Sequence, residues 1–163
     1  MRGRAPASTV ASGAEVMADG NVLLTGGSQA ANQLVGVNYT AAIWNPDTGK
    51  WTYGDDAAIP RLYHSTTLLL QDGSVLSLGG GAPGPLSNLN GEIYKPAYLT
   101  NADGTAADRP VITSAPTELE QRQDFKISVD DPASISRLIL TKYGATTHAF
   151  DQNQRFVPLE DVI

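Results

Sequence analysis

The sequence contains no cysteine, and only two of its 163 residues are histidines, His64 and His148. The absence of thiols excludes disulfides and the thiolate cages of structural zinc sites. A transition-metal site would therefore use imidazole, phenol and carboxylate ligands, a mixed set that suits tetragonal Cu(II). His64 follows Tyr63 at the head of the strand-like run Tyr63–Leu70, and His148 falls in the loop-like stretch Ala145–Phe150. Two imidazoles and a tyrosine oxygen thus point to copper.

Positive charge is also scarce, with 11 Lys and Arg against 17 Asp and Glu and a net charge of -6. No basic cluster marks a nucleic-acid or anionic membrane surface. No stretch approaches the roughly 18 to 20 apolar residues of a membrane span. Met1–Ala7 has basic residues but no apolar run after them, unlike a secretory signal peptide. We therefore expect neither a nucleic acid nor a membrane as partner.

Glycine and proline are frequent, with 16 and 10 residues, and 41% of the chain is hydrophobic. This composition favours short strands and turns over helices, and it is rich enough in apolar residues to bury a core. The absence of cysteine leaves the cellular compartment open, because many secreted domains fold without disulfides. We predict an all-β protein.

An internal repeat occurs in the first half of the chain. Val16–Gly27 aligns with Leu69–Gly80, 53 residues later, and both segments contain an Asp-Gly pair and end in Gly-Gly. Each copy predicts a strand, a two-residue type I′ hairpin turn at Asp19-Gly20 or Asp72-Gly73, and a second strand. The terminal glycine pair marks a bend or a close approach of a neighbouring backbone.

Further strands follow each copy of the repeat. The first copy continues with the predicted strands Ala41–Trp44 and Trp51–Tyr53, and Ile93–Pro96 echoes Ile43–Pro46. Four short strands at a period of about 50 residues are typical of a kelch blade. A propeller needs roughly 4 to 8 blades and this chain has material for about two, so we expect it to be part of something larger. An unrelated β-sandwich with similar hairpins is the alternative.

The pattern of residues in the sequence changes at Arg109. The glycine pairs stop, Pro110 and Pro116 mark a linker, and alternating strands typical of an immunoglobulin-like sandwich begin. Only three or four strands are expected before Ile163, against about seven in a whole sandwich. We therefore predict about two blades of a partial kelch-type β-propeller in residues 1–108, followed by a truncated immunoglobulin-like β-sandwich in residues 109–163.

Several motifs taken together resemble one enzyme family. They are Tyr63-His64-Ser65, Arg109-Pro110, Tyr143-Gly144, Thr147-His148, Gln154-Arg155 and Pro158-Leu159. In this order they resemble the copper radical oxidases, the galactose oxidase and glyoxal oxidase group, from about Ser12 to the end. The resemblance implies that residues 109–163 are the first part of that family's immunoglobulin-like early-set domain.

The resemblance also implies a metal site and a reaction. Tyr63 would be the axial ligand of one copper ion and the catalytic proton acceptor, with His64 and His148 as imidazole ligands. The family oxidises small aldehydes or primary alcohols with dioxygen to give hydrogen peroxide, and its members are secreted. Its radical-bearing tyrosine is crosslinked to a cysteine, and this chain has no cysteine. We therefore predict that the isolated chain is inactive, with missing propeller blades as a possible partner.

Two alternatives remain open. The chain could be a non-catalytic kelch and immunoglobulin-like module that binds carbohydrate or protein and retains both histidines as relics. Gln154 and Arg155 fit a solvated turn at least as well as groups near a copper loop, so the sequence assigns them no role.

Overall fold

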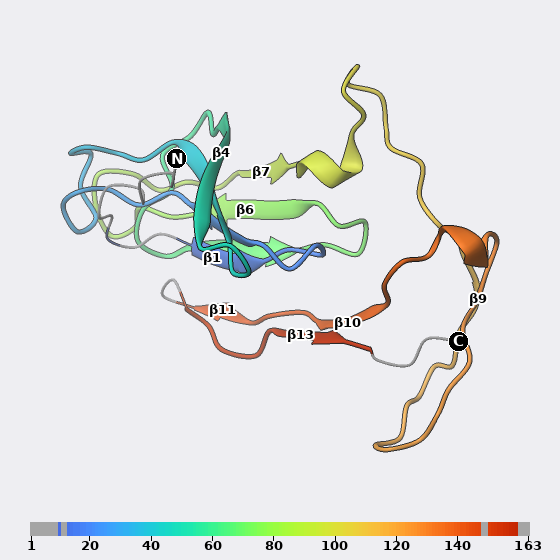
Figure 1. The fold of residues 1–163 in the computed structure, drawn as a ribbon. Helices are drawn as coiled ribbons and strands as arrows, with labels where there is room; N and C mark the ends of the chain where they lie inside the picture. Colours follow the sequence, from blue (N-terminus) through green and yellow to red (C-terminus); the bar gives the residue numbers. More distant parts are fainter. Residues whose placement is uncertain (1–9, 11–12, 148–149, 160–163) are drawn as a thin grey trace.

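The first half of the protein begins with a four-stranded antiparallel sheet. We describe the fold from a computed structural model, which covers residues 10, 13–147 and 150–159. The strands of this first sheet are hydrogen bonded in sequence order, and a longer loop over residues 26–39 joins the second strand to the third (Figure 1). They are β1 (Gly13–Val16), β2 (Val22–Thr25), β3 (Thr40–Asn45) and β4 (Lys50–Asp56).

A second antiparallel sheet repeats this order with three strands, β5 (Ser65–Leu69), β6 (Val75–Gly79) and β7 (Gly91–Tyr94). The first strands of the two sheets, β1 and β5, contact each other. Gly13 on β1 has no room for a side chain, since an added Cβ would overlap the Thr67 hydroxyl of β5. Two meanders therefore lie where two blades were predicted, and the all-β class is confirmed.

The core lies between these two sheets. Burial alternates along β1 and β5, as expected when one face of each strand is turned inward. Both sheets contribute to the buried apolar cluster, which comprises Met17, Leu23, Ala41, Leu69 and Val75. Each copy of the repeat thus contributes two residues to the core, Met17 and Leu23 from the first and Leu69 and Val75 from the second.

The hairpin loop of the first sheet has three residues, Ala18–Gly20, so the predicted two-residue type I′ turn is wrong. The Gly20 amide donates to the Met17 carbonyl at 3.0 Å, and the Met17 amide donates to the Asn21 carbonyl at 2.8 Å. Gly20 has a φ of 89°, whereas Asp19 is not among the residues with positive φ. A type I′ turn would require positive φ at both positions.

The aspartate explains why the loop is longer. Its Oδ1 accepts a hydrogen bond from the backbone amide two residues ahead, at 3.0 Å in the first sheet and at 2.9 Å from Ser74 to Asp72 in the second. This local bond favours a negative φ at the aspartate and leaves the left-handed conformation to the glycine. The loop Gln71–Gly73 repeats it, with Gly73 at a φ of 81°.

Tyr98 joins the two hairpin loops. It lies in the short 3-10 helix η1 (Ala97–Leu99) after β7. Its hydroxyl donates to the Gly73 carbonyl at 2.5 Å and accepts from the Ala18 amide at 3.4 Å. Burial raises the pKa of Tyr98 to about 12, so the phenol stays protonated and can donate.

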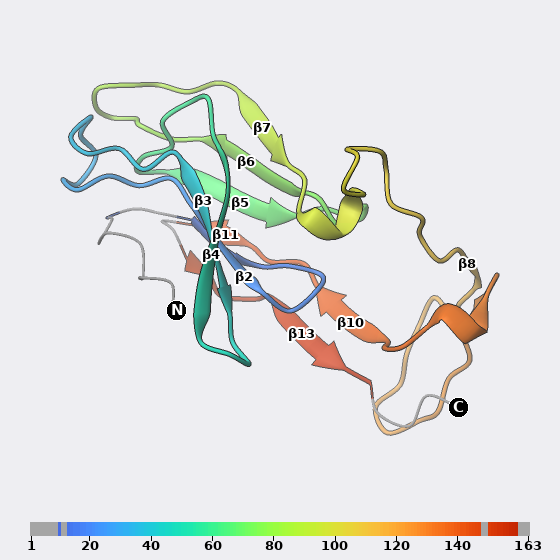
Figure 2. The same ribbon diagram turned by 45° about the horizontal axis from the view of Figure 1, so that its top comes forward.

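The remaining strands form three two-stranded antiparallel ladders, with β8 and β9 at the end away from the two sheets (Figure 2). Strands β11 and β12 contact β5 and β1 respectively. The described residues hold no helix of the length and apolarity that crossing a membrane requires. The domain boundary between residues 108 and 109 stays a prediction. The three ladders pair β8 (Ile112–Ser114) with β9 (Ser128–Val129), β10 (Ile139–Lys142) with β13 (Arg155–Pro158), and β11 (Thr146–Thr147) with β12 (Phe150–Asp151). The 3-10 helix η2 (Pro132–Ser134) precedes β10.

Candidate metal centre

Tyr63 and His64 occupy the centre of a tight turn just before β5. The Ser65 amide donates to the Leu62 carbonyl at 3.0 Å, which closes the turn. His64 has a φ of 66°, and Tyr63 is not among the residues with positive φ, which is the pattern of a type II turn. The predicted strand from Tyr63 therefore begins two residues late, at Ser65, because a left-handed residue cannot continue a β-ladder.

The conformation of His64 is uncommon for a residue other than glycine. The third position of a type II turn favours glycine or asparagine, and a larger side chain there costs about 1 kcal/mol or more. Such strain persists where the surrounding structure enforces it, and it gathers at functional sites. A histidine at this position is thus an observation that favours a functional role.

The two side chains of the turn lie together. Their ring centroids are 3.8 Å apart with a tilt of 31°, and His64 is exposed while Tyr63 is half-buried. His64 Nδ1 lies 2.9 Å from the Ala82 carbonyl oxygen. Because a carbonyl only accepts, Nδ1 carries a proton, and in the neutral imidazole the lone pair is then on Nε2, the tautomer that a metal-binding imidazole needs.

Glycine pairs from both sheets make room for the segment that leads into this turn. The Gly81 amide donates to the Tyr63 carbonyl at 2.7 Å, and the Gly27 amide donates to the Arg61 carbonyl at 2.7 Å. A Cβ on Gly80 would lie 3.0 Å from the Leu62 nitrogen, and one on Gly26 would lie 2.7 Å from the Arg61 oxygen. The repeated Gly-Gly signal in the sequence is thus explained by close backbone approach.

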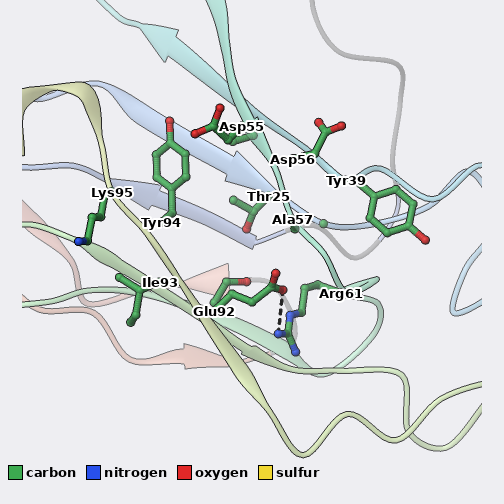
Figure 3. Close-up of a pocket in the computed structure, with 13 residues that line it drawn as sticks. Thr25, Tyr39, Asp55, Asp56, Ala57, Arg61, Glu92, Ile93, Tyr94 and Lys95 are labelled. Carbon is green, nitrogen blue, oxygen red and sulfur yellow. Dashed lines mark hydrogen bonds and ion pairs between the residues drawn. The ribbon is translucent and has the colours of Figure 1, made fainter. Parts of the chain in front are cut away.

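The buried side chain of Arg61 fixes the same segment through hydrogen bonds and an ion pair. Only 1% of the residue is exposed, and its Nη1 donates to the Gly79 and Asn90 carbonyls at 3.1 and 3.0 Å. Its Nη2 pairs with Glu92 Oε2 at 2.9 Å, at the edge of a cavity of about 310 Å³ between the sheets (Figure 3). A buried guanidinium with these partners fixes the backbone two residues before Tyr63.

His148 and Ala149 lie outside the described residues, whereas Thr147 before them and Phe150 after them are described. β11 and β12 pair with Thr146 opposite Asp151 and Thr147 opposite Phe150. β11 contacts β5, the strand that follows His64. Within residues 13–147 and 150–159, no group of three or more His, Cys, Asp or Glu side chains could hold a metal. The structure brings Tyr63 and His64 together and leaves the predicted third ligand undescribed.

Three polar side chains that the sequence did not assign join this ladder to the first sheet. Glu15 on β1 is 1% exposed, and its Oε1 accepts from Gln154 Nε2 at 2.6 Å and from the Leu69 amide of β5 at 2.8 Å. The Asp151 carboxyl, at the end of β12, lies near enough to Glu15 to interact with it electrostatically. We call Glu15, Asp151 and Gln154 the Glu15 clasp. The signal that could have revealed it is a glutamate on the inward face of a strand.

Burial, with a smaller contribution from the nearby Asp151 carboxylate, raises the pKa of Glu15 to about 8. The hydrogen bonds from Leu69 and Gln154 act in the opposite direction but do not offset the loss of hydration. Glu15 is therefore protonated at neutral pH and can share its proton with Asp151.

Comparison with known proteins identifies the family. Residues 109–162 match the family described as "Galactose oxidase-like, Early set domain". A galactose oxidase from Gibberella zeae is 33% identical over 148 residues, which cover 88% of this chain and 22% of that protein. The chain belongs to the galactose oxidase-like family. The resemblance stated from the sequence motifs is thus confirmed.

Two further relatives agree with this family. An aldehyde oxidase, GLOX, from Vitis pseudoreticulata is 38% identical over 112 residues, covering 62% of this chain and 21% of that protein. A solved fungal alcohol oxidase of the AA5 family, in complex with copper, superposes with a TM-score of 0.87 and 31% identity, covering 98% of this chain and 34% of that structure. The chain thus spans about a fifth of these two curated relatives and about a third of the solved one.

The strain at His64 predicts an order of stability between two substitutions. We expect His64→Gly to be about 1 kcal/mol more stable than His64→Ala, because only glycine enters the left-handed region without a Cβ penalty. Both variants lose the same imidazole and its bond to Ala82, so the comparison isolates the backbone. Urea denaturation measures the difference, and equal stabilities would contradict the proposed strain.

The raised pKa of Glu15 predicts a pH-dependent stability. The folded state holds this proton more tightly than the unfolded chain, whose glutamate pKa is near 4.5. Its contribution is therefore fully present below about pH 4.5 and is lost as the pH rises towards 8, by up to about 1.4 kcal/mol per pH unit. Denaturation across this range measures the effect, and Glu15→Gln should flatten it. An unchanged pH profile in that variant would argue against Glu15 as the titrating group.

Proposed function

We propose that this chain contributes Tyr63, His64 and His148 to a single copper site in an oxidase. In the complete protein, a primary alcohol or an aldehyde is oxidised by dioxygen, which is reduced to hydrogen peroxide. The observation that carries the proposal is the turn at Tyr63 and His64. It presents a phenol beside an imidazole, and the Ala82 carbonyl at 2.9 Å sets the tautomer of that imidazole.

The donor set of this turn fits copper. Imidazole nitrogen and phenol oxygen are ligands that Cu(II) accepts, and the exposed His64 is accessible from solvent. The hydrogen bond to Ala82 is the outer contact that usually orients a metal-bound histidine. The names of the relatives support an oxidase, since they include a galactose oxidase, an aldehyde oxidase and a copper-bound alcohol oxidase.

Each residue has a distinct proposed role. His64 and His148 are the imidazole ligands. Tyr63 would hold the metal through its phenol oxygen and would accept at that Oη the hydroxyl proton of the bound alcohol. When bound, copper supplies one-electron redox chemistry. The buried Arg61 and the backbone bond from Gly81 to Tyr63 keep the turn rigid, so that the two side chains are held before substrate arrives.

The chain by itself lacks part of what this chemistry uses. It has no cysteine, so it cannot form the cysteine-crosslinked tyrosine that the family resemblance implies. We propose that kelch-type blades absent from this sequence supply that residue, that residues 1–108 and 109–163 belong to the propeller and the early-set domain, and that the whole protein is secreted.

Copper binding is the direct test. We expect the chain to bind one Cu(II), and the double variant His64→Ala, His148→Ala to bind at least about tenfold more weakly because both imidazoles are gone. Tyr63→Phe should alter the visible absorption of the Cu(II) complex, whereas the matched control Tyr53→Phe on the exposed face of β4 should not. Binding that is equal in the chain and the double variant would contradict the site.

Peroxide release tests whether the chain is complete as a catalyst. With copper, dioxygen and small alcohols or aldehydes, we expect no sustained turnover, because no residue of this chain can form the crosslinked radical. A peroxidase-coupled assay measures the product. Turnover that continues over many cycles, and that disappears in Tyr63→Phe, would show that the chain needs no further segment.

A further inference from the structure

The Glu15 clasp connects three parts of the protein that are distant in sequence. Glu15 lies on β1, Leu69 donates to it from β5, and Gln154 reaches it across 139 residues. Gln154 also forms two bonds with the backbone of Val16, accepting from its amide and donating to its carbonyl, each at 2.8 Å. The amide side chain thus pairs with β1 as another strand would.

Asp151 ties the clasp to the ladder of β11 and β12. Its Oδ1 accepts from the Ala145 amide at 3.1 Å, which links the residue before β11 to the last residue of β12. Gly144 lies so close that an added Cβ would overlap the Asp151 carboxylate. The aspartate is therefore held in place from its own ladder and faces Glu15 on the first sheet.

The second oxygen of each carboxyl group requires a hydrogen-bond donor. In the described part of the chain, Glu15 Oε2 and Asp151 Oδ2 are both buried and neither has a hydrogen-bond donor. A buried oxygen without a donor is costly, and two buried carboxylates would also repel each other. One proton held between the two groups removes both costs. Asp151 is the titratable group that faces Glu15, since Leu69 and Gln154 contribute only amides.

We propose that Glu15, Asp151 and Gln154 are positioning residues that hold the strands flanking His148 against β1 and β5. The inference rests on the proposed copper site, because it assigns the clasp a role in placing the second imidazole relative to the turn of Tyr63 and His64. Strand β5 begins directly after that turn, and the same Glu15 oxygen that binds Gln154 also binds the Leu69 amide of β5. One carboxyl group therefore fixes both ligand-bearing segments.

A double-mutant cycle with Cu(II) separates positioning from general stability. We expect Glu15→Leu to weaken copper binding about tenfold in the chain that contains His148, and to have a clearly smaller effect in the His148→Ala background, where only the contact to β5 and the His64 turn is left to lose. Glu15→Gln keeps an acceptor for Leu69 and a donor for Asp151, so it should bind copper as the unaltered chain does. Glu118→Gln, at an exposed position, is the matched control. Equal losses in the two backgrounds would overturn the proposal.

Hydrogen exchange of the metal-free chain provides a second readout, which also distinguishes this proposal from the copper site. In Gln154→Leu we expect faster exchange at the amides of residues 146, 147, 150 and 151, with β3 and β6 unchanged, whether or not the chain binds copper. This variant also replaces Glu15→Leu in the cycle if the latter does not fold. Unchanged exchange in the ladder, or a uniform increase across all strands, would overturn the clasp. Failure of copper binding with the expected exchange would instead refute the copper site alone.

Discussion

The buried carboxyl of Glu15 is the contact on which the arrangement of the three parts depends. A carboxyl on the inward face of β1 loses its hydration, and only partners from outside the strand can replace it. Those partners are an amide of β5 and the side chains of Gln154 and Asp151. The first sheet, the second sheet and the C-terminal ladder therefore meet at one buried polar group.

The turn that carries Tyr63 and His64 follows from a second constraint, the close approach of backbones. The glycines that follow β2 and β6 have no side chain, so the backbone from Arg61 to Tyr63 can pass close to them. The amides of Gly27 and Gly81 donate hydrogen bonds to carbonyls of this segment. The strained His64 is held by this surrounding structure rather than by its own preference. A rigid scaffold thus supports the exposed pair that the proposed function needs.

Much of the fold could be predicted because its signals are local. The apolar strands with their repeated Asp-Gly and Gly-Gly pairs predicted both meanders, but the hairpin loop length and the first residue of β5 were wrong. Those errors arise from an aspartate that accepts a hydrogen bond from the nearby backbone and from a histidine in the left-handed conformation, which residues other than glycine seldom adopt. Tyr63 and His64 were selected by motif and lie together. The role of Gln154 could not be predicted, since its partners on β1 lie 138 and 139 residues away.

The long sequence separation between Glu15 and Gln154 also affects the order in which the parts of the protein fold. A contact that closes a loop of 139 residues in a chain of 163 forms against a larger entropy cost than the local hairpins, which close within a few residues. The two meanders can thus assemble first, each from neighbouring strands, and the ladder of β11 and β12 docks onto a finished surface. A copper ligand carried on that ladder would reach its place only in the last step, so that the apoprotein is built before a metal site exists.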